Sequence, residues 1–245
     1  MSKKLVILSG GLDSTVLLYW MIREQKINPE NIIAISFKLE ETSDFIDNFD
    51  PNNTLYQNNQ IELKYAQKTT KKLNIKHHII DLTYLNVILK HMRTSDKHNV
   101  NSTNKNKQAT SMPFRNMIMM SNALAFGQVF EADQIFVGYQ QQDQYGYWDT
   151  NMNFVNGINN IAKLNPDANN IEIVCPFVNL SKSDEIKIGL KYQVPWEDTW
   201  TCYNPVKQND EIVSCGKCLS CKERLFNFEK LNIVDTQKYF KEEEN

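Results

Sequence analysis

The feature that most constrains the fold is the alternation of short apolar runs with longer helical patterns along the first 193 residues. Short continuous apolar runs are typical of strands that are buried on both faces of a parallel sheet. They lie at 4–8, 32–37, 77–82, 134–139 and 171–177, and helical patterns lie at 13–25, 60–73, 83–92, 114–132, 151–164 and 181–193. This alternation predicts an α/β fold with a doubly wound parallel five-stranded sheet and helices on both faces.

Two further segments complete the predicted organisation. Residues 94–111 are polar and poor in hydrophobic residues, so we expect a flexible loop or lid there. The last predicted helix begins after an N-cap serine, either Ser181 or Ser183. Because four of the five cysteines gather at the C-terminal end, we interpret 1–195 as one domain and 196–245 as a small helical subdomain.

The composition argues against several function classes. The 245-residue chain has a formal net charge of −2, which argues against a non-specific nucleic-acid binder or a polybasic membrane protein. No apolar run approaches the roughly 20 residues that a membrane-spanning helix needs. The apolar stretch at the N-terminus is too short for a secretory signal peptide, so we expect a cytoplasmic protein.

A turn of small residues, SGGLDS from Ser9 to Ser14, follows the first predicted strand. Glycines allow backbone N–H groups to converge on one point, and the N-terminus of the next helix adds partial positive charge, which favours an anion. The turn matches neither a Walker A loop nor a dinucleotide-binding turn. Asp13 would repel phosphates unless Mg²⁺ lay between them. The residues alone leave two interpretations open: a capped strand-to-helix turn and a metal-bridged triphosphate site.

Four cysteines near the C-terminal end have the spacing of a metal site. Cys202, Cys215, Cys218 and Cys221 are separated by twelve, two and two residues, so their thiolates can reach one ion. Four thiolates typically hold a structural Zn²⁺ in a closed tetrahedral site. An iron–sulfur cluster is the alternative, although nothing else in the sequence indicates electron transfer. The fifth, Cys175, lies in an apolar run and is predicted to be a buried hydrophobic residue.

Motifs spread along the chain resemble one enzyme family. SGGLDS resembles the SGGxDS loop of the PP-loop ATP pyrophosphatase superfamily, whose members cleave ATP between the α and β phosphates. TWTCYNP and CGKCLSCKERLF are similar to motifs of the 7-cyano-7-deazaguanine synthase (QueC) branch of that superfamily. MPFRN at 112–116, DQYGYWDTNMNF at 143–154, and the pair Gln57 and Glu62 resemble its V-P-G-R-N, D-x-S-G-Y-P-D-C-R-x-x-F and Q-x-x-x-x-E motifs.

The resemblance implies a carbon–nitrogen ligase that acts in queuosine biosynthesis. Such an enzyme converts 7-carboxy-7-deazaguanine and ammonia to 7-cyano-7-deazaguanine through adenylated intermediates. It implies ATP, Mg²⁺ and Zn²⁺ as cofactors, a small-molecule substrate with no nucleic-acid or membrane partner, and a homodimer.

The resemblance also assigns roles to individual residues. The expected catalytic residues are Ser9, Asp13, Ser14, Arg115 and Lys182. The expected nucleotide-binding residues are Leu8, Ser9, Gly10, Gly11, Leu12, Asp13, Ser14, Thr15, Ser36, Phe37 and Gly138. The expected substrate-binding residues are Asn116, Asp143, Tyr147 and Asp149, and the metal ligands are Cys202, Cys215, Cys218 and Cys221. Asp13 would bind Mg²⁺, whereas Arg115 and Lys182 would neutralise phosphate charge. Without the resemblance, Arg115 and Lys182 fit solvated helix ends, and 143–149 fits a polar surface loop.

The sequence departs from the family pattern where substrate is expected to bind. Phe114 stands where the family has Gly, and Tyr145, Trp148, Thr150 and Asn151 stand where it has Ser, Pro, Cys and Arg. One alternative is therefore a divergent enzyme that adenylates another carboxylate or stops at the amide, as in deazaguanine DNA modification or defence. A tRNA-modifying PP-loop enzyme is the other, which the net charge of −2 disfavours. The intact SGGLDS loop argues against a non-catalytic binding module.

Overall fold

The computed structural model describes residues 2–39, 54–88, 112–143, 147–167 and 170–241, without the side chains of 54–58. The predictions for 94–111, for the side chain of Gln57 and for Tyr145 lie outside this part of the chain. Within it, no helix is both long and apolar enough to cross a membrane.

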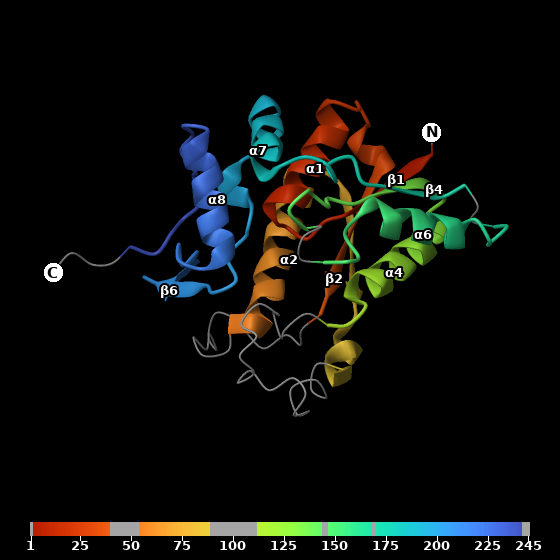
Figure 1. Ribbon diagram of the computed structural model, residues 1–245, viewed down its shortest axis with the longest axis horizontal. Coiled ribbons are helices and arrows are strands. Elements are labelled where there is room, and N and C mark those ends of the chain that lie inside the picture. The colour runs from red at the N-terminus through yellow and green to blue at the C-terminus, as the bar shows by residue number, and fades with distance from the viewer. Residues whose placement is uncertain (1, 40–53, 89–111, 144–146, 168–169, 242–245) are drawn as a thin grey trace.

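A five-stranded sheet forms the centre of the molecule (Figure 1). Its strands are β1 (Lys3–Ile7), β2 (Ile32–Lys38), β3 (Lys76–Asp81), β4 (Ala132–Phe136) and β5 (Glu172–Val174), in the order β3-β2-β1-β4-β5. Every pairing is parallel, and the central strand β1 places Leu5 opposite both Ile33 and Ile135. The predicted α/β class with five parallel strands is confirmed.

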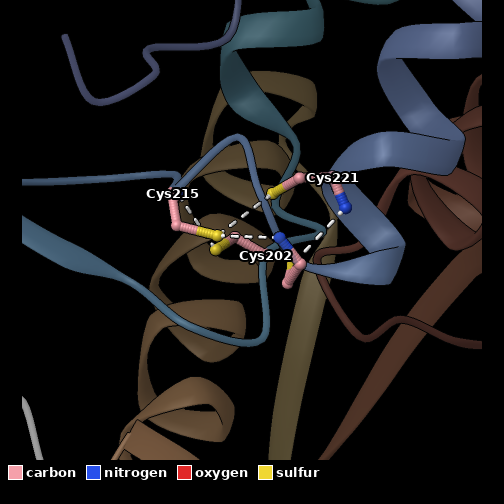
Figure 2. Close-up of side chains that lie close together, drawn as sticks. Cys202, Cys215 and Cys221 are labelled. Carbon is pink, nitrogen blue, oxygen red and sulfur yellow. Dashed lines mark hydrogen bonds between the residues drawn. The ribbon is translucent and has the colours of Figure 1, made fainter. Parts of the chain in front are cut away.

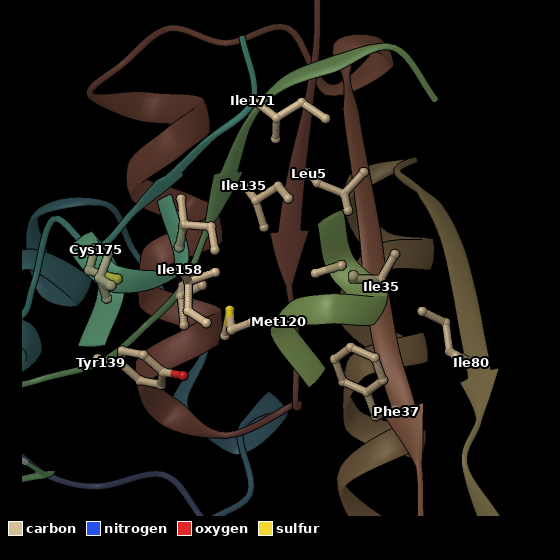
Figure 3. Packing of buried hydrophobic residues seen from close by; sticks show 14 of the residues in the cluster. Leu5, Ile35, Phe37, Ile80, Met120, Ile135, Tyr139, Ile158, Ile171 and Cys175 are labelled. Carbon is tan, nitrogen blue, oxygen red and sulfur yellow. The ribbon is translucent and has the colours of Figure 1, made fainter. Parts of the chain in front are cut away.

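Helices cover both faces of this sheet, as predicted. One face carries α1 (Leu12–Arg23), α2 (Thr54–Leu73) and α7 (Lys182–Lys191), and the other carries α4 (Arg115–Val129) and α6 (Met152–Ala162). Side chains alternate along a strand, so neighbouring residues of β1 enter opposite layers. Leu5 packs with Met120 and Ile158 (Figure 3). Val6 packs in the other layer with Val16.

The ends of several elements differ from the predicted ones for local reasons. Strand β5 stops at Val174, just before Pro176, which has no backbone N–H to donate to a neighbouring strand. The predicted helix over 83–92 begins as a 3₁₀ turn, η2 (Thr83–Leu85), preceded along the chain by another, η1 (Pro29–Asn31). Ser181 is the N-cap of α7, because its hydroxyl accepts a hydrogen bond from the Asp184 backbone N–H at 3.3 Å.

The C-terminal segment packs against α7 and adds a hairpin that the sequence analysis did not predict. Trp196, in η4 (Trp196–Asp198), lies over Gly189 of α7, where a Cβ would be 2.1 Å from the indole ring. An antiparallel hairpin, β6 (Val206–Gln208) and β7 (Glu211–Val213), precedes α8 (Leu219–Lys230). Its turn residues Asn209 and Asp210 both have positive φ, which is typical of tight hairpin turns. The Asn209–Asp210 dipeptide was the feature of the sequence from which this hairpin turn could have been predicted.

The turn between β1 and α1 is packed directly against α2. Gly10 has a φ of +89°, a conformation that is strained for other residues. A Cβ on Gly10 would lie 2.1 Å from the Glu62 carbonyl oxygen and 2.7 Å from the Ala66 nitrogen. Glycine is therefore required here both by the backbone conformation and by the close approach of α2.

Replacing Gly10 by alanine is expected to lower the free energy of unfolding by about 2–4 kcal/mol, because positive-φ strain adds to overpacking. Gly157 is the matched control: it is exposed in α6, and a Cβ there meets nothing within 4 Å. Gly157→Ala is expected to raise the free energy of unfolding by about 0.5–1 kcal/mol. Urea unfolding measures both free energies of unfolding. A Gly10→Ala variant with the stability of the wild type would contradict the close packing of Gly10 against α2.

Candidate functional site

The loops that follow β1 and β4 meet at the carboxyl end of the sheet. From β1 the chain passes outward to β2 and β3 and then returns to β4 on the other side of β1. In open α/β sheets, ligands bind at such a point of reversal. A Cβ on Gly138, which follows β4, would lie 3.2 Å from the Ser14 nitrogen. The two loops are therefore in direct contact.

Serine hydroxyls and backbone N–H groups hold the Ser9–Ser14 loop in shape. The Ser14 Oγ accepts a hydrogen bond from the Ser9 N–H at 3.2 Å, and the two hydroxyl oxygens are 3.0 Å apart. The Ser9 Oγ accepts from the Gly11 N–H at 3.1 Å. Gly11 is the N-cap of α1 and supplies no side-chain cap. The helix N-terminus thus adds partial positive charge to a loop that is suited to phosphate.

The C-terminal segment fixes this loop from a second side. The Trp200 backbone N–H donates to the Gly10 carbonyl at 2.9 Å. The Trp200 indole is buried, lies 5.4 Å from the Tyr65 ring of α2, and donates to the Cys202 carbonyl at 2.9 Å. The Ser9–Ser14 loop and the cysteine cluster are therefore linked through one residue. Sequence reasoning missed this link, since no local pattern marks it.

Asp13 and Lys182 form an ion pair across the site. Asp13 lies in the first turn of α1, Lys182 opens α7, and their charged groups are in direct contact. Glu185, one turn further along α7, is fully buried, with a carboxylate oxygen 3.5 Å from the Lys182 Nζ. Its carboxyl group also interacts with that of Asp13 through a side-chain hydrogen bond. The sequence analysis missed Glu185, although its i,i+3 spacing from Lys182 was available as a signal.

Burial and charge act in opposite directions on the pKa values here. Burial would raise the pKa of Asp13, but the Lys182 ammonium helps to hold it below its usual value. Burial and the Asp13 charge raise the pKa of Glu185 well above its usual value. The same two causes raise the pKa of Asp143, in the loop after β4. A cation bound at Asp13 would favour the ionised forms of all three carboxyl groups.

Glu62 is a second titratable group beside the loop, and it interacts with Arg115. Arg115 is the first residue of α4, and its charge acts on the Glu62 carboxylate. Burial raises the pKa of Glu62 to about 7, although Arg115 lowers it. The Glu62 backbone carbonyl is the group packed against Gly10. The sequence analysis included Glu62 in a motif without a role, and the structure shows a carboxyl group able to exchange a proton near neutral pH.

The residues predicted to bind substrate gather around the loop after β4. The Asn116 Nδ2 donates to the Asp149 carbonyl at 3.4 Å, which joins the start of α4 to this loop. The Asp143 carboxylate accepts from the Gln140 N–H at 3.1 Å, and the Tyr147 N–H donates to the Asp143 carbonyl at 2.9 Å. Asp149 is buried. The structure brings these residues together, with Asp143 partly engaged in holding its own loop.

The side chains predicted to line the adenine site are engaged in the fold itself. The Ser36 hydroxyl donates to the Leu8 carbonyl at 2.5 Å and lies 2.7 Å from the His77 Nε2. Burial lowers the pKa of His77 to about 4, so the ring is neutral. Phe37 belongs to the hydrophobic core, and Leu8, Leu12 and Thr15 are buried. These side chains are therefore part of the buried interior next to the Ser9–Ser14 loop.

The four C-terminal cysteines converge, and Figure 2 shows three of them together. All four sulfur atoms lie within 4.8 Å of one another, and tetrahedral bonds of 2.3 Å to zinc would place them about 3.8 Å apart. Backbone N–H groups of Cys215 and Cys218 donate to the sulfurs of Cys202 and Cys215, both at 3.2 Å. Gly216, with a φ of +69°, forms the tight turn after Cys215. These residues fit a metal ion.

Arg224 connects α8, the helix that contains Cys221, to the segment that carries Trp200. Its guanidinium is buried and forms two hydrogen bonds with the Asp235 carboxylate, at 2.7 and 2.9 Å. It also donates to the Thr199 hydroxyl at 2.9 Å and to the Trp196 carbonyl at 3.0 Å. A planar group with five fixed donors suits such a junction. Loss of Arg224 would leave the Asp235 charge buried without its cation.

Comparison with known proteins identifies the family. A sequence model of the family described as "Queuosine biosynthesis protein QueC" matches residues 52–232. The chain belongs to the QueC family. A 7-cyano-7-deazaguanine synthase from Marinomonas sp. (strain MWYL1) is 30% identical over 97% of this chain and 98% of its own length. Another, from Rickettsia bellii (strain OSU 85-389), is 31% identical over 98% and 99%.

Membership of the QueC family confirms the predicted family and the prediction that the chain is an enzyme. The matched segment includes the four cysteines, Arg115 and Lys182, and begins after the Ser9–Ser14 loop. Among solved structures, an NH3-dependent NAD synthetase from Campylobacter jejuni has a TM-score of 0.44 at 14% identity, over 79% of this chain and 66% of that one.

The cysteine cluster of this QueC family member is expected to hold one metal ion per chain. Cys218→Ser is expected to lose the ion and to melt at a lower temperature, because binding is coupled to folding of the site. Cys175→Ala, which removes a buried cysteine outside the cluster, is the control and is expected to keep the ion. Elemental analysis counts zinc and iron per chain. Iron in place of zinc, or full retention of zinc by Cys218→Ser, would contradict the four-thiolate zinc site.

Proposed function

We propose that this chain is a 7-cyano-7-deazaguanine synthase, which uses ATP to convert 7-carboxy-7-deazaguanine and ammonia to the nitrile. The observation that carries the proposal is the relationship to synthases of that name over nearly the whole length of both chains. The Ser9–Ser14 loop at the point of strand reversal, with Asp13 and Lys182 beside it, supports it.

The first half of the proposed reaction makes the acid reactive. A carboxylate is a poor electrophile, because oxide is a poor leaving group. Its oxygen attacks the α-phosphorus of ATP, pyrophosphate leaves, and an acyl adenylate forms. Ammonia then attacks the carbonyl carbon, AMP leaves with the carbon–oxygen bond pair, and the nitrogen loses a proton to give the amide. The protein contributes positioning and charge stabilisation.

The second half removes the remaining oxygen. The amide oxygen attacks the α-phosphorus of a second ATP, and pyrophosphate leaves again. The nitrogen loses its two remaining protons, the carbon–oxygen bond breaks, and AMP departs as the nitrile forms. One site therefore serves both adenylations, because the attacking atom is in each case an oxygen on the same carbon.

The residues around the loop have the chemistry that these steps need. Backbone N–H groups of the loop and the hydroxyls of Ser9 and Ser14 would bind the departing pyrophosphate. Arg115 and Lys182 would balance its charge, Arg115 through its planar fork of donors. The Asp13 carboxylate would hold Mg²⁺, which supplies charge neutralisation on the phosphates.

Glu62 is the group best suited to accept protons from nitrogen. Its pKa of about 7, which results from burial, lies near neutral pH, where a general base is most effective. Its backbone packs against the loop, and the charge of Arg115 acts on its carboxyl group. In the proposed reaction it would take protons from the nitrogen.

The remaining parts of the proposal concern the whole protein. Zn²⁺ on the four cysteines would be structural, because four protein ligands leave no open position for substrate. Residues 1–195 would form the ATP pyrophosphatase domain and 196–245 the zinc-binding subdomain. We also propose a homodimer and a cytoplasmic location, which suits cysteines that must stay reduced.

The direct test is to incubate the protein with ATP, ammonium and 7-carboxy-7-deazaguanine and to identify the products by mass. The expected result is 7-cyano-7-deazaguanine with two AMP per nitrile. Asp13→Asn is expected to lower kcat/KM by about 100-fold or more, because charge stabilisation at the phosphates is lost. Asp210→Asn is the matched control, since Asp210 is almost fully exposed in the hairpin turn.

Three other outcomes would contradict the proposal. The amide as final product would favour an enzyme that stops after one adenylation. AMP formation only with a different carboxylic acid would favour a divergent acceptor. Turnover that requires tRNA would favour a tRNA-modifying enzyme of the same superfamily.

A further inference from the structure

Tyr139 carries a buried hydroxyl with no hydrogen-bond partner among the described residues. Its side chain is 8% exposed, and it follows Gly138 in the loop that contacts the Ser9–Ser14 loop. Figure 3 shows Tyr139 at the same end of the sheet as Phe37. Buried polar groups are nearly always paired in folded proteins, so an unpaired one at the ligand-binding end of the sheet indicates a missing partner.

Two exposed aromatic residues, Phe114 and Trp148, precede Arg115 and Asp149 in the chain. Phe114 and Trp148 are each 58% exposed, and their rings meet edge to face at 5.7 Å. Trp148 also packs edge to face on Phe154, a core residue, at 5.6 Å, so its ring is held in place. Phe114 has a φ of +55°, a conformation that favours glycine. An exposed aromatic ring therefore stands at a position where the backbone conformation favours glycine.

The hydroxyl and the aromatic pair are connected through their neighbours. Asp149 follows Trp148, Arg115 follows Phe114, and the charges of both act on the Tyr139 hydroxyl. The hydrogen bond from the Asn116 Nδ2 to the Asp149 carbonyl, at 3.4 Å, joins the two segments. Burial, with the charges of Cys175 and Asp149, raises the pKa of Tyr139 above its usual value, so its hydroxyl remains a donor.

We propose that Tyr139, Asp149 and the Phe114–Trp148 pair form the subsite that binds the planar heterocycle of the acceptor. The Tyr139 hydroxyl donates to a ring carbonyl oxygen, and the buried Asp149 carboxylate accepts from the adjacent ring N–H. The ring stacks against the exposed aromatic pair. This inference rests on the proposed function, and it names the residues that select a guanine-like base.

A guanine-like edge suits this donor and acceptor arrangement. It presents a carbonyl oxygen beside an N–H group, so a neutral donor such as Tyr139 and a carboxylate such as Asp149 would satisfy both. A base without the carbonyl would leave the Tyr139 hydroxyl buried and unpaired, and such sites reject analogues strongly. Sequence comparison with the family pattern would not predict the aromatic part, because Phe114 and Trp148 stand at two of its departures.

The experiment compares five single variants for steady-state kinetics with 7-carboxy-7-deazaguanine and for binding of 7-deazaguanine, which lacks the carboxylate. Tyr139→Phe is expected to raise the acceptor KM and the Kd of 7-deazaguanine about 10-fold, with the KM for ATP unchanged. Its melting temperature should stay equal or rise, because an unpaired buried hydroxyl is removed. Phe114→Gly and Trp148→Ala are each expected to raise the acceptor KM and the Kd of 7-deazaguanine about 5- to 50-fold, which is the range for the loss of one stacking contact.

Two of the variants are controls. Trp148→Phe keeps an aromatic ring and is expected to bind within about 3-fold of the wild type, given the tolerance of stacking for ring type. Phe226→Ala removes a ring that is 63% exposed on α8 and should change neither constant.

Distinct outcomes separate this inference from the proposed function. A wild-type enzyme that forms the nitrile while Tyr139→Phe and Phe114→Gly bind 7-deazaguanine normally overturns the subsite alone. A protein that makes no nitrile, yet binds 7-deazaguanine with the expected losses, overturns the proposed function and supports the subsite. A lower melting temperature for Tyr139→Phe, or a change of oligomeric state in Trp148→Ala, shows structural roles and overturns the inference.

Discussion

The hydrogen bond from the Trp200 N–H to the Gly10 carbonyl is the contact on which the candidate site depends. Gly10 has little freedom, because its positive φ and the Glu62 carbonyl fix it from the side of α2. Trp200 is held in turn by burial, by the Cys202 carbonyl and by the Arg224 junction next to it. The Ser9–Ser14 loop and the cysteine cluster, far apart in the sequence, are therefore joined through the contacts of Trp200.

Buried charge gives this region its chemistry. Lys182 is paired with Asp13, and burial together with the Asp13 charge holds the pKa of the neighbouring Glu185 well above its usual value. In the proposed function, Asp13 would hold a divalent cation, which would supply positive charge at the phosphates. The Lys182 ammonium would then also face the phosphates, and the cation would favour the ionised form of Glu185.

The sheet and the metal ligands could be predicted from the sequence because their signals are local. Parallel buried strands need continuous apolar runs, and thiolates that share one ion need short spacings. Tyr139 and Trp200 could not be assigned, since their roles arise from contacts between distant segments, whereas Glu185 could have been noticed from its i,i+3 spacing to Lys182. In the sequence, Phe114 stood out only because it replaces the glycine of the family pattern. Its positive φ explains why glycine suits this position.

Isotope labelling tests most directly whether this chain transfers AMP to the acceptor at the Ser9–Ser14 loop. Both carboxylate oxygens of 7-carboxy-7-deazaguanine are labelled with ¹⁸O, and the products are separated and analysed by mass. The mechanism predicts one labelled oxygen in each AMP, formed in two successive steps, and unlabelled pyrophosphate. Label in pyrophosphate, or unlabelled AMP in the presence of product, would contradict transfer of AMP to the acceptor.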